Sequence, residues 1–587
     1  MNDAPLKPPP EDLFGQLIRG WRAYVALAFI ALASALPGVA KLPVLDRDEA
    51  RFAQATRQML ETGDFVRIRL QEDERNKKPI GIHWMQAASV SVAETFTHKL
   101  NMIWAYRLPS TLGALLATLA CFWAGAALMR REAAFCGAAL FGACVLMGAE
   151  GMIGKTDGAL AGFTTLAMAA LAQFYAGAVT RPRAMALLFW AAMGAAILIK
   201  GPVGPMVAGL AVLAIGFWRR DWSWLKPLGW WAGPVLCVAM VAPWMVGIAI
   251  ATEGRFFTEA IGEDLAPKLG GGSEGHFAWP GYHLALVSVM IFPATLALPA
   301  AVRAGLGALR TRSGEVAPNA AGALQFLIAW AVPAFIVFEL APTKLAHYPL
   351  PTYPAIALLG AFGLARALED KQQIVRWLGV ALFALAGAAL IGVISYGATF
   401  MPGDADAGAR RAVQTALTMG VIGVVCLGVI MFVRRLPAQC AAAAVFALSL
   451  SFTLRERVLP EADTFLISTR VDAALTRERL LPNDERQLYV TGYGEMSLVF
   501  MTRTDIRIRG PQEMAEEIAP GDALVIEGRE MDDAMAALDA RGLVYNERVA
   551  PIEGVNYGNG DDVVMHVGVV SGEAIEKQAP ARNAAPK

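Results

Sequence analysis

The stretch Lys155–Pro202, KTDGALAGFTTLAMAALAQFYAGAVTRPRAMALLFWAAMGAAILIKGP, contains the pattern that decides the fold. Two apolar segments, 157–178 and 184–199, are separated by a short loop that carries Arg181 and Arg183. Because about 20 mostly apolar residues cross a bilayer as a helix, the stretch predicts two transmembrane helices joined on the arginine side. The opposite ends of the two segments carry the charged residues Lys155, Asp157 and Lys200.

The same pattern repeats along most of the chain. Hydrophobic residues make up 56% of the 587 residues, which excludes an ordinary soluble protein. We predict a mostly α-helical, polytopic membrane bundle of about thirteen spans. The expected spans are 22–40, 108–129, 132–149, 157–178, 184–199, 203–218, 228–251, 281–302, 321–341, 348–366, 375–397, 412–433 and 437–456.

Basic residues gather in alternate loops between these spans, as they do around Arg130 and Arg434. Short cytoplasmic loops carry such an excess, so we place these loops and the N-terminal segment 1–20 in the cytoplasm. An odd number of spans in the membrane domain, 21–457, then leaves the C-terminal part outside. The long loops expected on that same outer side are 41–107 and 252–280.

Composition narrows the possible functions further. All six cysteines fall within predicted spans, so we expect the outer parts to lack disulfides. Lysine plus arginine and aspartate plus glutamate both number 51, and the basic residues are explained by topology, so we expect no nucleic-acid partner. Residues 1–11 lack the hydrophobic core of a secretory signal, so we expect the first span to remain as an anchor.

The composition becomes that of a soluble domain beyond the last span. We predict a small α/β domain over 458–570 and a disordered tail over 571–587. Gly492-Tyr493-Gly494 follows an expected strand, but Ser497 stands where a dinucleotide loop needs a third glycine, which favours a plain tight turn. The expected strands are 487–493, 497–502, 505–509, 523–527 and 563–570, and the expected helices are 512–518 and 531–541.

The acidic segment Asp46-Arg47-Asp48-Glu49-Ala50-Arg51 opens an amphipathic helix in the first outer loop. One interpretation makes Asp48 a helix N-cap paired with Arg51. The other makes Asp48, with Glu49 beside it, a general base or a group that holds the departing sugar. Several acids at the membrane surface favour the functional interpretation.

Lys77 and Lys78 precede Pro79 and a surface helix that includes His83. Lysines at a membrane interface commonly extend their ammonium groups to water, which is the structural alternative. Ammonium groups at this level also suit a lipid phosphate, which is the functional one.

Further charged residues mark the outer ends of other spans. One such residue alone would serve as a membrane anchor, whereas several that converge predict a polar cavity, because charges at membrane depth need partners or water. The residues concerned are Lys155, Asp157, Lys200, Lys344, His347 and Tyr348.

The second long outer loop offers possible metal ligands. His276 and His283, with Glu263 and Asp264 upstream, are of the types that bind Zn²⁺ or Mn²⁺. Their spacing matches no tight ligand motif, so hydrogen bonding within the loop is the alternative.

Five motifs occur in a characteristic order: Asp48-Glu49-Ala50-Arg51-Phe52-Ala53, Lys78-Pro79, Lys155-Thr156-Asp157, Lys200-Gly201-Pro202 and Tyr348-Pro349-Leu350-Pro351-Thr352-Tyr353-Pro354-Ala355. Over residues 20–365 the chain thereby resembles the bacterial aminoarabinose transferases of lipid A. Those enzymes belong to the GT-C glycosyltransferases, as do the protein O-mannosyltransferases. The resemblance implies inverting transfer of a sugar from a polyprenyl (undecaprenyl) phosphate at the periplasmic face of the bacterial inner membrane.

The resemblance also implies roles for particular residues. It places Asp48 and Asp157 at the reaction centre and Lys78 on the carrier phosphate. Two departures stand out: Lys77 occupies a position that is acidic in the family and resembles a metal ligand there, and Lys268 stands where an arginine is expected. A metal site of the family's composition and the family's sugar are therefore not carried over.

The expected acceptor is lipid A or another envelope glycolipid. The alternatives are a lipid-linked-sugar flippase or transporter, a protein O-glycosyltransferase of the same fold, and a non-catalytic sensor. Transporters place charges and broken helices near the bilayer midplane, a pattern that this sequence lacks. The expected site residues are Asp48, Glu49 and Asp157 for catalysis; Lys78, Lys200, Lys268 and Lys344 for the donor phosphate; His83, Glu263, Asp264, His347 and Tyr348 for substrate; and His276 and His283 for a divalent metal.

Overall fold

The computed structural model describes residues 13–45, 47–267, 278–310 and 320–572. The chain divides into two compact units. Unit 1 comprises Met1–Leu42, Met59–Thr399 and Gly403–Pro460, and unit 2 comprises Pro43–Gln58, Phe400–Pro402 and Glu461–Lys587.

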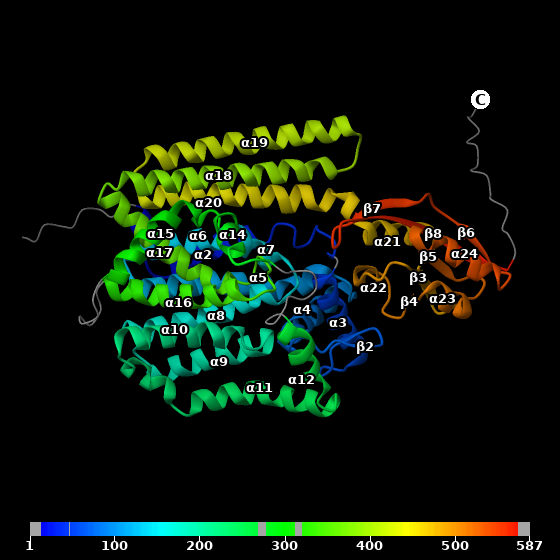
Figure 1. Ribbon diagram of the computed structural model, residues 1–587, viewed down its shortest axis with the longest axis horizontal. Coiled ribbons are helices and arrows are strands. Elements are labelled where there is room, and N and C mark those ends of the chain that lie inside the picture. Colours follow the sequence, from blue (N-terminus) through cyan, green and yellow to red (C-terminus); the bar gives the residue numbers. More distant parts are fainter. Residues whose placement is uncertain (1–12, 46, 268–277, 311–319, 573–587) are drawn as a thin grey trace, which may run out of the picture. The chain divides into compact units, whose positions relative to one another are not determined.

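Unit 1 is a helical bundle in which α18, α19 and α20 lie side by side along one edge and α9, α10 and α11 along the other (Figure 1). Its α-helices are α1 (Leu13–Leu17), α2 (Gly20–Ala35), α4 (Gly81–Thr97), α5 (Ile103–Leu128), α6 (Arg131–Gly142), α7 (Val145–Met152), α8 (Thr156–Tyr175), α9 (Pro182–Lys200), α10 (Val203–Arg219), α11 (Ala232–Ala251), α12 (Arg255–Glu259), α14 (Tyr282–Met290), α15 (Leu298–Arg310), α16 (Ala320–Leu340), α17 (Tyr353–Glu369), α18 (Gln373–Gly397), α19 (Ala405–Phe432) and α20 (Leu436–Phe452). A hairpin of β1 (Arg69–Leu70) and β2 (Asp73–Glu74) and π-helical turns at Ala260–Leu265 and Thr453–Val458 complete its main elements.

Each of the predicted spans coincides with one helix or with a bent pair of helices. Eight helices are long and apolar enough to cross a membrane, and the number rises to ten if each bent pair is one span. The bent pairs are α6 with α7, at 54°, and α14 with α15, at 113°. Two shorter apolar helices, α2 and α10, match the predicted spans 22–40 and 203–218. The chain is therefore a multi-pass membrane protein, as predicted.

Glycines let α5 and α8 approach each other closely. A β-carbon on Gly162 would lie 2.7 Å from the carbonyl oxygen of Gly113, and one on Gly158 would lie 2.9 Å from that of Ser110. Small residues allow such close approach of membrane helices, where packing and not hydrophobicity drives association. This contact positions the turn between α7 and α8.

Unit 2 contains a six-stranded mixed sheet with helices on both faces. The strand order is β4-β3-β5-β8-β6, and β7 also pairs with β8. The strands β3, β4 and β5 are parallel, whereas β8 is antiparallel to β5, β6 and β7. The strands are β3 (Leu488–Thr491), β4 (Arg507–Ile508), β5 (Ala523–Glu527), β6 (Val544–Glu547), β7 (Ile552–Asn556) and β8 (Asp561–Ser571), and the helices are α21 (Ile467–Arg477), α22 (Met496–Met501), α23 (Pro511–Glu517) and α24 (Met531–Asp539).

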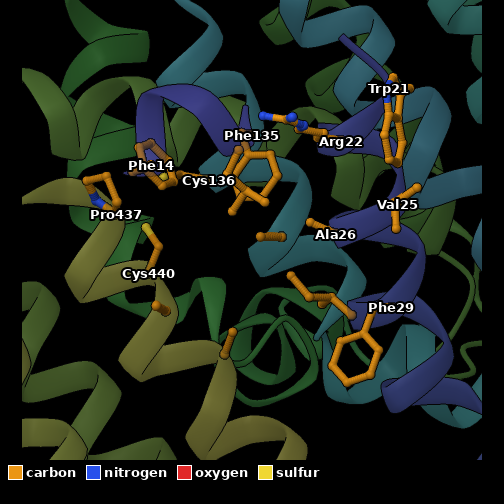
Figure 2. Close-up of a pocket in the computed structure, with 15 residues that line it drawn as sticks. Phe14, Trp21, Arg22, Val25, Ala26, Phe29, Phe135, Cys136, Pro437 and Cys440 are labelled. Carbon is orange, nitrogen blue, oxygen red and sulfur yellow. The ribbon is translucent and has the colours of Figure 1, made fainter. Parts of the chain in front are cut away.

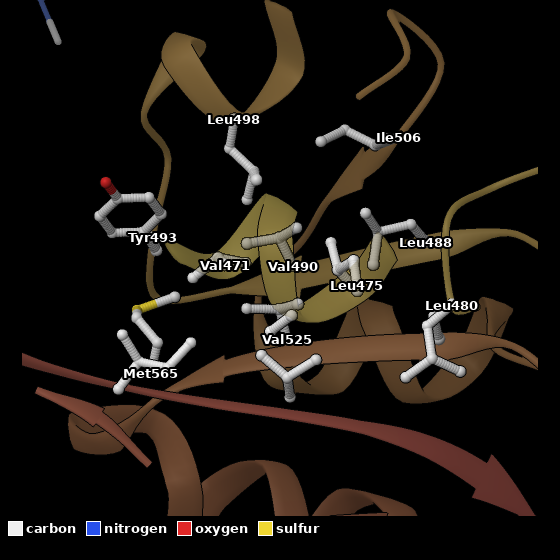
Figure 3. Close-up of a cluster of buried hydrophobic side chains, with 14 of the residues drawn as sticks. Val471, Leu475, Leu480, Leu488, Val490, Tyr493, Leu498, Ile506, Val525 and Met565 are labelled. Carbon is white, nitrogen blue, oxygen red and sulfur yellow. The ribbon is translucent and has the colours of Figure 1, made fainter. Parts of the chain in front are cut away.

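The central strand β5 is buried along its whole length because both faces of the sheet are covered. Val525 points to a core formed with α21 and α22, where Val471, Leu475 and Val490 also lie (Figure 3). Leu524 points to the second core, formed with α23 and α24. A strand buried on both faces reads as a continuous apolar run, which is why it was predictable.

The predicted α/β domain is confirmed, but one of its predicted strands is wrong. Most of 497–502 belongs to helix α22 (Met496–Met501), whose Leu498, Val499 and Phe500 are buried. A short apolar run does not distinguish a buried strand from a buried helix. The sequence analysis also missed α21, β6 and β7.

The Gly492 turn is built without features of a phosphate-binding loop. Gly492 has a φ of 78°, and a β-carbon there would meet the side chains of Glu527 and Glu530 at 2.8 Å. Ser468 hydrogen-bonds both the Tyr493 hydroxyl, at 2.8 Å, and the Ser497 hydroxyl, at 2.6 Å. Two glutamates beside the turn disfavour an anion, so the tight-turn interpretation is the one that fits.

Helix α3 (Asp48–Thr62) runs from unit 2 into unit 1. We expected all of 41–107 to be an outer loop of the membrane domain, but 43–58 clusters with the C-terminal residues. The contacts responsible are hydrogen bonds, such as that of 2.8 Å from Gln54 Nε2 to the Thr504 hydroxyl. The helix with the acidic motif is thus held by the C-terminal part of the chain.

Candidate functional site

The turn between α7 and α8 is held by side chains from two other helices. Ser110 on α5 donates a hydrogen bond of 2.8 Å from its hydroxyl to the Lys155 carbonyl. Gln86 on α4 donates one of 3.0 Å from Nε2 to the Gly154 carbonyl. These bonds satisfy backbone oxygens at the break between the helices, and they hold Glu150, Lys155 and Asp157 in place.

Two ion pairs lie side by side at this turn. Lys155 Nζ is 3.1 Å from Glu150 Oε2, and Lys200 Nζ is 2.5 Å from Asp157 Oδ1. The side chains of Glu150 and Asp157 are only 5% and 7% exposed. Asp157 also lies in the first turn of α8, where the helix dipole favours a negative charge.

His347 lies between the two carboxylates. Its Nδ1 is 3.7 Å from Glu150 Oε1, and its Nε2 is 3.6 Å from Asp157 Oδ2. Burial lowers the pKa of His347 well below its usual value; Asp157 acts to raise that pKa, while Lys155, Lys200 and Lys78 act to lower it further. The imidazole is therefore neutral near pH 7, within reach of both carboxylates.

Lys200 and Tyr348 complete one side of the network. Lys200 is the last residue of α9, and its ammonium nitrogen lies 5.3 Å from the centre of the Tyr348 ring. A cation at that distance is attracted by the ring's negative face. Gly201 has a φ of 58°, which lets the chain turn sharply after Lys200. The predicted grouping of Asp157, Lys200, His347 and Tyr348 is thus present in the structure.

Lys78 lies three residues before a tight contact between α4 and α9. A β-carbon on Gly81, the first residue of α4, would lie 2.7 Å from the carbonyl of Leu198 near the end of α9. This contact brings the chain just after Lys78 close to the chain just before Lys200. The positive charge of Lys78 acts to lower the pKa of His347, and Lys77 is exposed.

Lys344, another predicted phosphate ligand, contacts backbone instead. Its side chain is buried, and Nζ donates hydrogen bonds of 2.8 Å to the Ala278 carbonyl and 2.6 Å to the Ala341 carbonyl. In this arrangement Lys344 holds the loop after α16. Lys268 lies outside the described residues.

His283 does not fit a metal ligand in this structure. Its Nδ1 is 2.8 Å from Glu339 Oε2, and its Nε2 is 3.0 Å from the Leu345 carbonyl, so both ring nitrogens have partners within the chain. His276 lies outside the described residues. Among the residues that are described, no group of three or more His, Cys, Asp or Glu side chains could hold a metal.

Three predicted substrate residues lie on α4 and in the turn after α12. Glu263 is exposed and Asp264 is half-buried, both within the π-helical turn Ala260–Leu265. His83 is fully buried in the first turn of α4. Their assignment to the substrate stays a prediction.

The acidic motif starts helix α3 in unit 2. Glu49 is buried, and its Oε2 accepts a hydrogen bond of 2.9 Å from the backbone amide of Leu45. Glu49 therefore stabilises the turn that precedes the helix. Asp48, at the first position of α3, is half-buried. Of the two acids, Asp48 is the better candidate for contact with substrate.

Glu150 was not predicted as a site residue, and Lys155 was expected only as one of the charges that converge on a polar cavity. Glu150 lies one residue beyond the predicted span 132–149, where an acid among apolar residues is itself a functional signal. The structure shows that each of the two residues neutralises the other next to Asp157.

Known proteins that resemble this chain in sequence are described as glycosyl-group transferases. Residues 39–254 match the family model of dolichyl-phosphate-mannose-protein mannosyltransferases. The chain is 28% identical over 360 residues to an undecaprenyl phosphate-alpha-4-amino-4-deoxy-L-arabinose arabinosyl transferase of Pectobacterium carotovorum, a match that covers 59% of this chain and 61% of that protein. A transferase of the same description from Pseudomonas aeruginosa is 26% identical over 59% of this chain and 61% of its own length.

A solved structure extends the likeness to nearly the whole chain. The crystal structure of ArnT from Cupriavidus metallidurans bound to undecaprenyl phosphate aligns with a TM-score of 0.72, covering 96% of this chain and 100% of ArnT at 19% identity. An alignment of that extent shows a common fold for the bundle and the C-terminal domain. The chain has the GT-C glycosyltransferase fold, and it resembles the bacterial aminoarabinose transferases in sequence and structure.

Proposed function

We propose that this protein is a glycosyltransferase that moves a sugar from a polyprenyl phosphate to lipid A or another envelope glycolipid at the periplasmic face of the inner membrane. The observation that carries the proposal is the set of ammonium groups gathered at the buried network. Lys155 Nζ lies 3.1 Å from Glu150, and Lys200 Nζ lies 2.5 Å from Asp157 and 5.3 Å from the centre of the Tyr348 ring. Ammonium groups held in this way suit a phosphate.

A polyprenyl phosphate suits this network for two reasons, one that concerns its charged phosphate and one that concerns its hydrocarbon chain. The phosphate meets ammonium groups in surroundings of low polarity, where charge interactions are stronger than in water. The hydrocarbon chain stays in the bilayer beside the bundle. The names of the relatives and the undecaprenyl phosphate in the related crystal structure support this donor class.

In the proposed reaction an acceptor oxygen attacks the anomeric carbon of the sugar and forms the new bond. The bond from that carbon to the phosphate oxygen breaks, and its electron pair leaves with the polyprenyl phosphate. Lys78 and Lys200 stabilise the negative charge that grows on the phosphate. A phosphate acceptor needs no base, whereas a hydroxyl acceptor transfers its proton to a carboxylate, for which Asp157 and Asp48 are the candidates.

A protein acceptor is the second candidate. The match of residues 39–254 to a protein mannosyltransferase model supports it. The curated relatives named as arabinosyl transferases support the glycolipid instead, and their matches extend over more of the chain.

The test uses the purified full-length protein in nanodiscs with radiolabelled undecaprenyl-phosphate sugars, including aminoarabinose and hexose donors. Lipid A and hydroxyl-containing peptides are offered separately, and labelled product is separated by mass. We expect labelled lipid A from the wild type and none from Asp157→Asn. Asp221→Asn is the matched control, because Asp221 is an exposed aspartate at the opposite end of the bundle and bonds only its own turn.

Two outcomes would contradict the proposal. Transfer to peptide alone would replace the glycolipid by a protein acceptor. Movement of the labelled donor across a proteoliposome membrane, without product and unaffected by Asp157→Asn, would indicate a transporter.

A further inference from the structure

An apolar groove runs along the bundle between α2 and α20, with α6 at its base (Figure 2). Its volume is about 670 Å³, within the range of ~300–1,000 Å³ that ligand sites occupy. Val25, Ala26 and Phe29 of α2 form one wall, and Pro437 and Cys440 of α20 form the other. With one exception, Arg22, its lining side chains are uncharged and nearly all apolar.

The length of the groove along the helices is close to the thickness of one bilayer leaflet. Its lining extends from Trp21 to Ile30 on α2 and from Pro437 to Ala444 on α20. At about 1.5 Å per residue these stretches are about 14 Å and 10 Å long. Half of the hydrocarbon core is about 15 Å thick, so a single acyl chain fits along the groove.

A second groove, the arginine groove, meets the apolar groove at Phe14 and Pro437, which line both. Its volume is about 910 Å³. Its charged lining residues are Arg130, Arg366, Arg434, Arg435, Glu132 and Glu369.

The charges of the arginine groove do not cancel. Arg130 lies 2.8 Å from Glu369 and 3.9 Å from Glu132, so it contacts both glutamates. Within the described part of the chain, the three other arginines form no ion pair with a carboxylate. Those arginines are Arg366, Arg434 and Arg435.

Two helix N-termini add to this positive field. Glu132 and Ala133 in the first turn of α6, and Leu436 and Pro437 at the start of α20, line the arginine groove. The first backbone amides of a helix lack intrahelical partners, and the helix dipole is positive there. Arginines and amide groups together favour a phosphate at the mouth of the apolar groove.

We propose that the two grooves bind one anionic phospholipid of the bilayer. An acyl chain lies in the apolar groove, and the headgroup phosphate lies against Arg434 and Arg435. Trp21, 70% exposed at the same end of α2, lies at the level where tryptophans meet headgroups. This site is at the opposite end of the helices from Asp157, so it does not depend on the proposed transfer reaction.

The test reconstitutes the full-length protein with phosphatidylglycerol or phosphatidylcholine and counts retained lipids by native mass spectrometry. We expect the wild type to retain phosphatidylglycerol preferentially. The double variant Arg434→Gln with Arg435→Gln should weaken that retention about tenfold to thirtyfold, because each basic residue near an anionic headgroup adds to the binding free energy. Ala441→Trp, which fills the groove from an exposed position, should also expel the lipid.

Matched controls separate the site from general effects of charge and bulk. Arg181→Gln with Arg183→Gln removes two arginines where α9 begins, next to a proline in its first turn as at α20, but outside both grooves. Val445→Trp adds the same bulk to an exposed position of α20 outside the groove. Both controls should retain phosphatidylglycerol like the wild type.

Three results would overturn the proposal. Equal retention of the two lipids would remove the anionic preference, and equal loss in the Arg181/Arg183 control would make the effect nonspecific. Stronger lipid retention after deletion of residues 1–12 would identify the protein's own N-terminal segment as the occupant.

Discussion

Arg57 and Phe500 are separated by 443 residues in the sequence, and Nη1 of Arg57 donates a hydrogen bond of 2.6 Å to the carbonyl oxygen of Phe500. The same guanidinium group lies 3.4 Å from the carbonyl oxygens of Val499 and Thr502. Arg57 is on α3, the helix that begins at Asp48. The C-terminal domain therefore positions the helix that carries the acidic motif, which gives this domain a structural role.

Removing the Arg57 side chain should loosen α3. Arg57→Ala leaves the carbonyls of Phe500 and its neighbours without their donor, and an unsatisfied buried polar group costs about 1–3 kcal/mol. Hydrogen exchange of residues 43–58 should accelerate, with little change in α5 or α8. Arg51→Ala is the control, since the Arg51 side chain makes no hydrogen bond or ion pair with a described residue. Equal protection in both variants would show that Arg57 is dispensable.

Gly81 should tolerate no side chain. In Gly81→Ala the new methyl group would lie 2.7 Å from the Leu198 carbonyl, and overpacking of that kind costs about 1–3 kcal/mol. The variant should melt at a lower temperature in detergent and lose activity, because α4 and α9 carry Lys78 and Lys200. Gly209→Ala, an exposed helix position with open space around it, should melt like the wild type.

Lys78 and Lys77 should differ in their effect on donor use. Lys78 precedes α4, whose first residue Gly81 packs against α9 near Lys200, so we place Lys78 on the donor phosphate, whereas Lys77 is exposed. A charge-assisted contact contributes about 1.5–3 kcal/mol, so Lys78→Ala should lower kcat/KM for the donor roughly tenfold to hundredfold. Lys77→Ala should have a much smaller effect. A larger loss for Lys77→Ala would exchange the roles of the two lysines.

His347 should make the protein less stable in mild acid. Its folded-state pKa is depressed, so between that value and about 6.5 the unfolded chain binds a proton that the folded protein does not. Stability is therefore lost as the pH falls below about 6.5 and is unaffected by this group above it. Melting temperatures from pH 7.5 to 5.5 should fall less steeply in His347→Gln.

The orientation of the chain is a further prediction. The basic loops place Arg220 in the cytoplasm and the residues after Arg457 in the periplasm. A periplasm-specific reporter fused after Arg457 should be active, and one fused after Arg220 should be inactive. The reverse pattern would put the Asp157 network on the cytoplasmic side.

The sequence alone determined the helical spans and the class of the C-terminal domain. The apolar segments 157–178 and 184–199 correspond to α8 and α9, because length and hydrophobicity are local properties that a bilayer selects directly. The same reasoning failed at 497–502, where a short apolar run fits both a strand and a helix and the packing around it makes it helical.

Only the tertiary structure decided which charged residues meet. Lys200 and Lys344 each lie at the same end of the bundle, next to an apolar span. Lys200 contacts the Asp157 carboxylate, whereas Lys344 contacts two backbone carbonyls. Likewise, the sequence around Arg57 does not predict that Phe500 is its hydrogen-bond partner. The pairing of charges depends on how helices distant in sequence pack, and close contacts such as that between Gly81 and Leu198 set that packing.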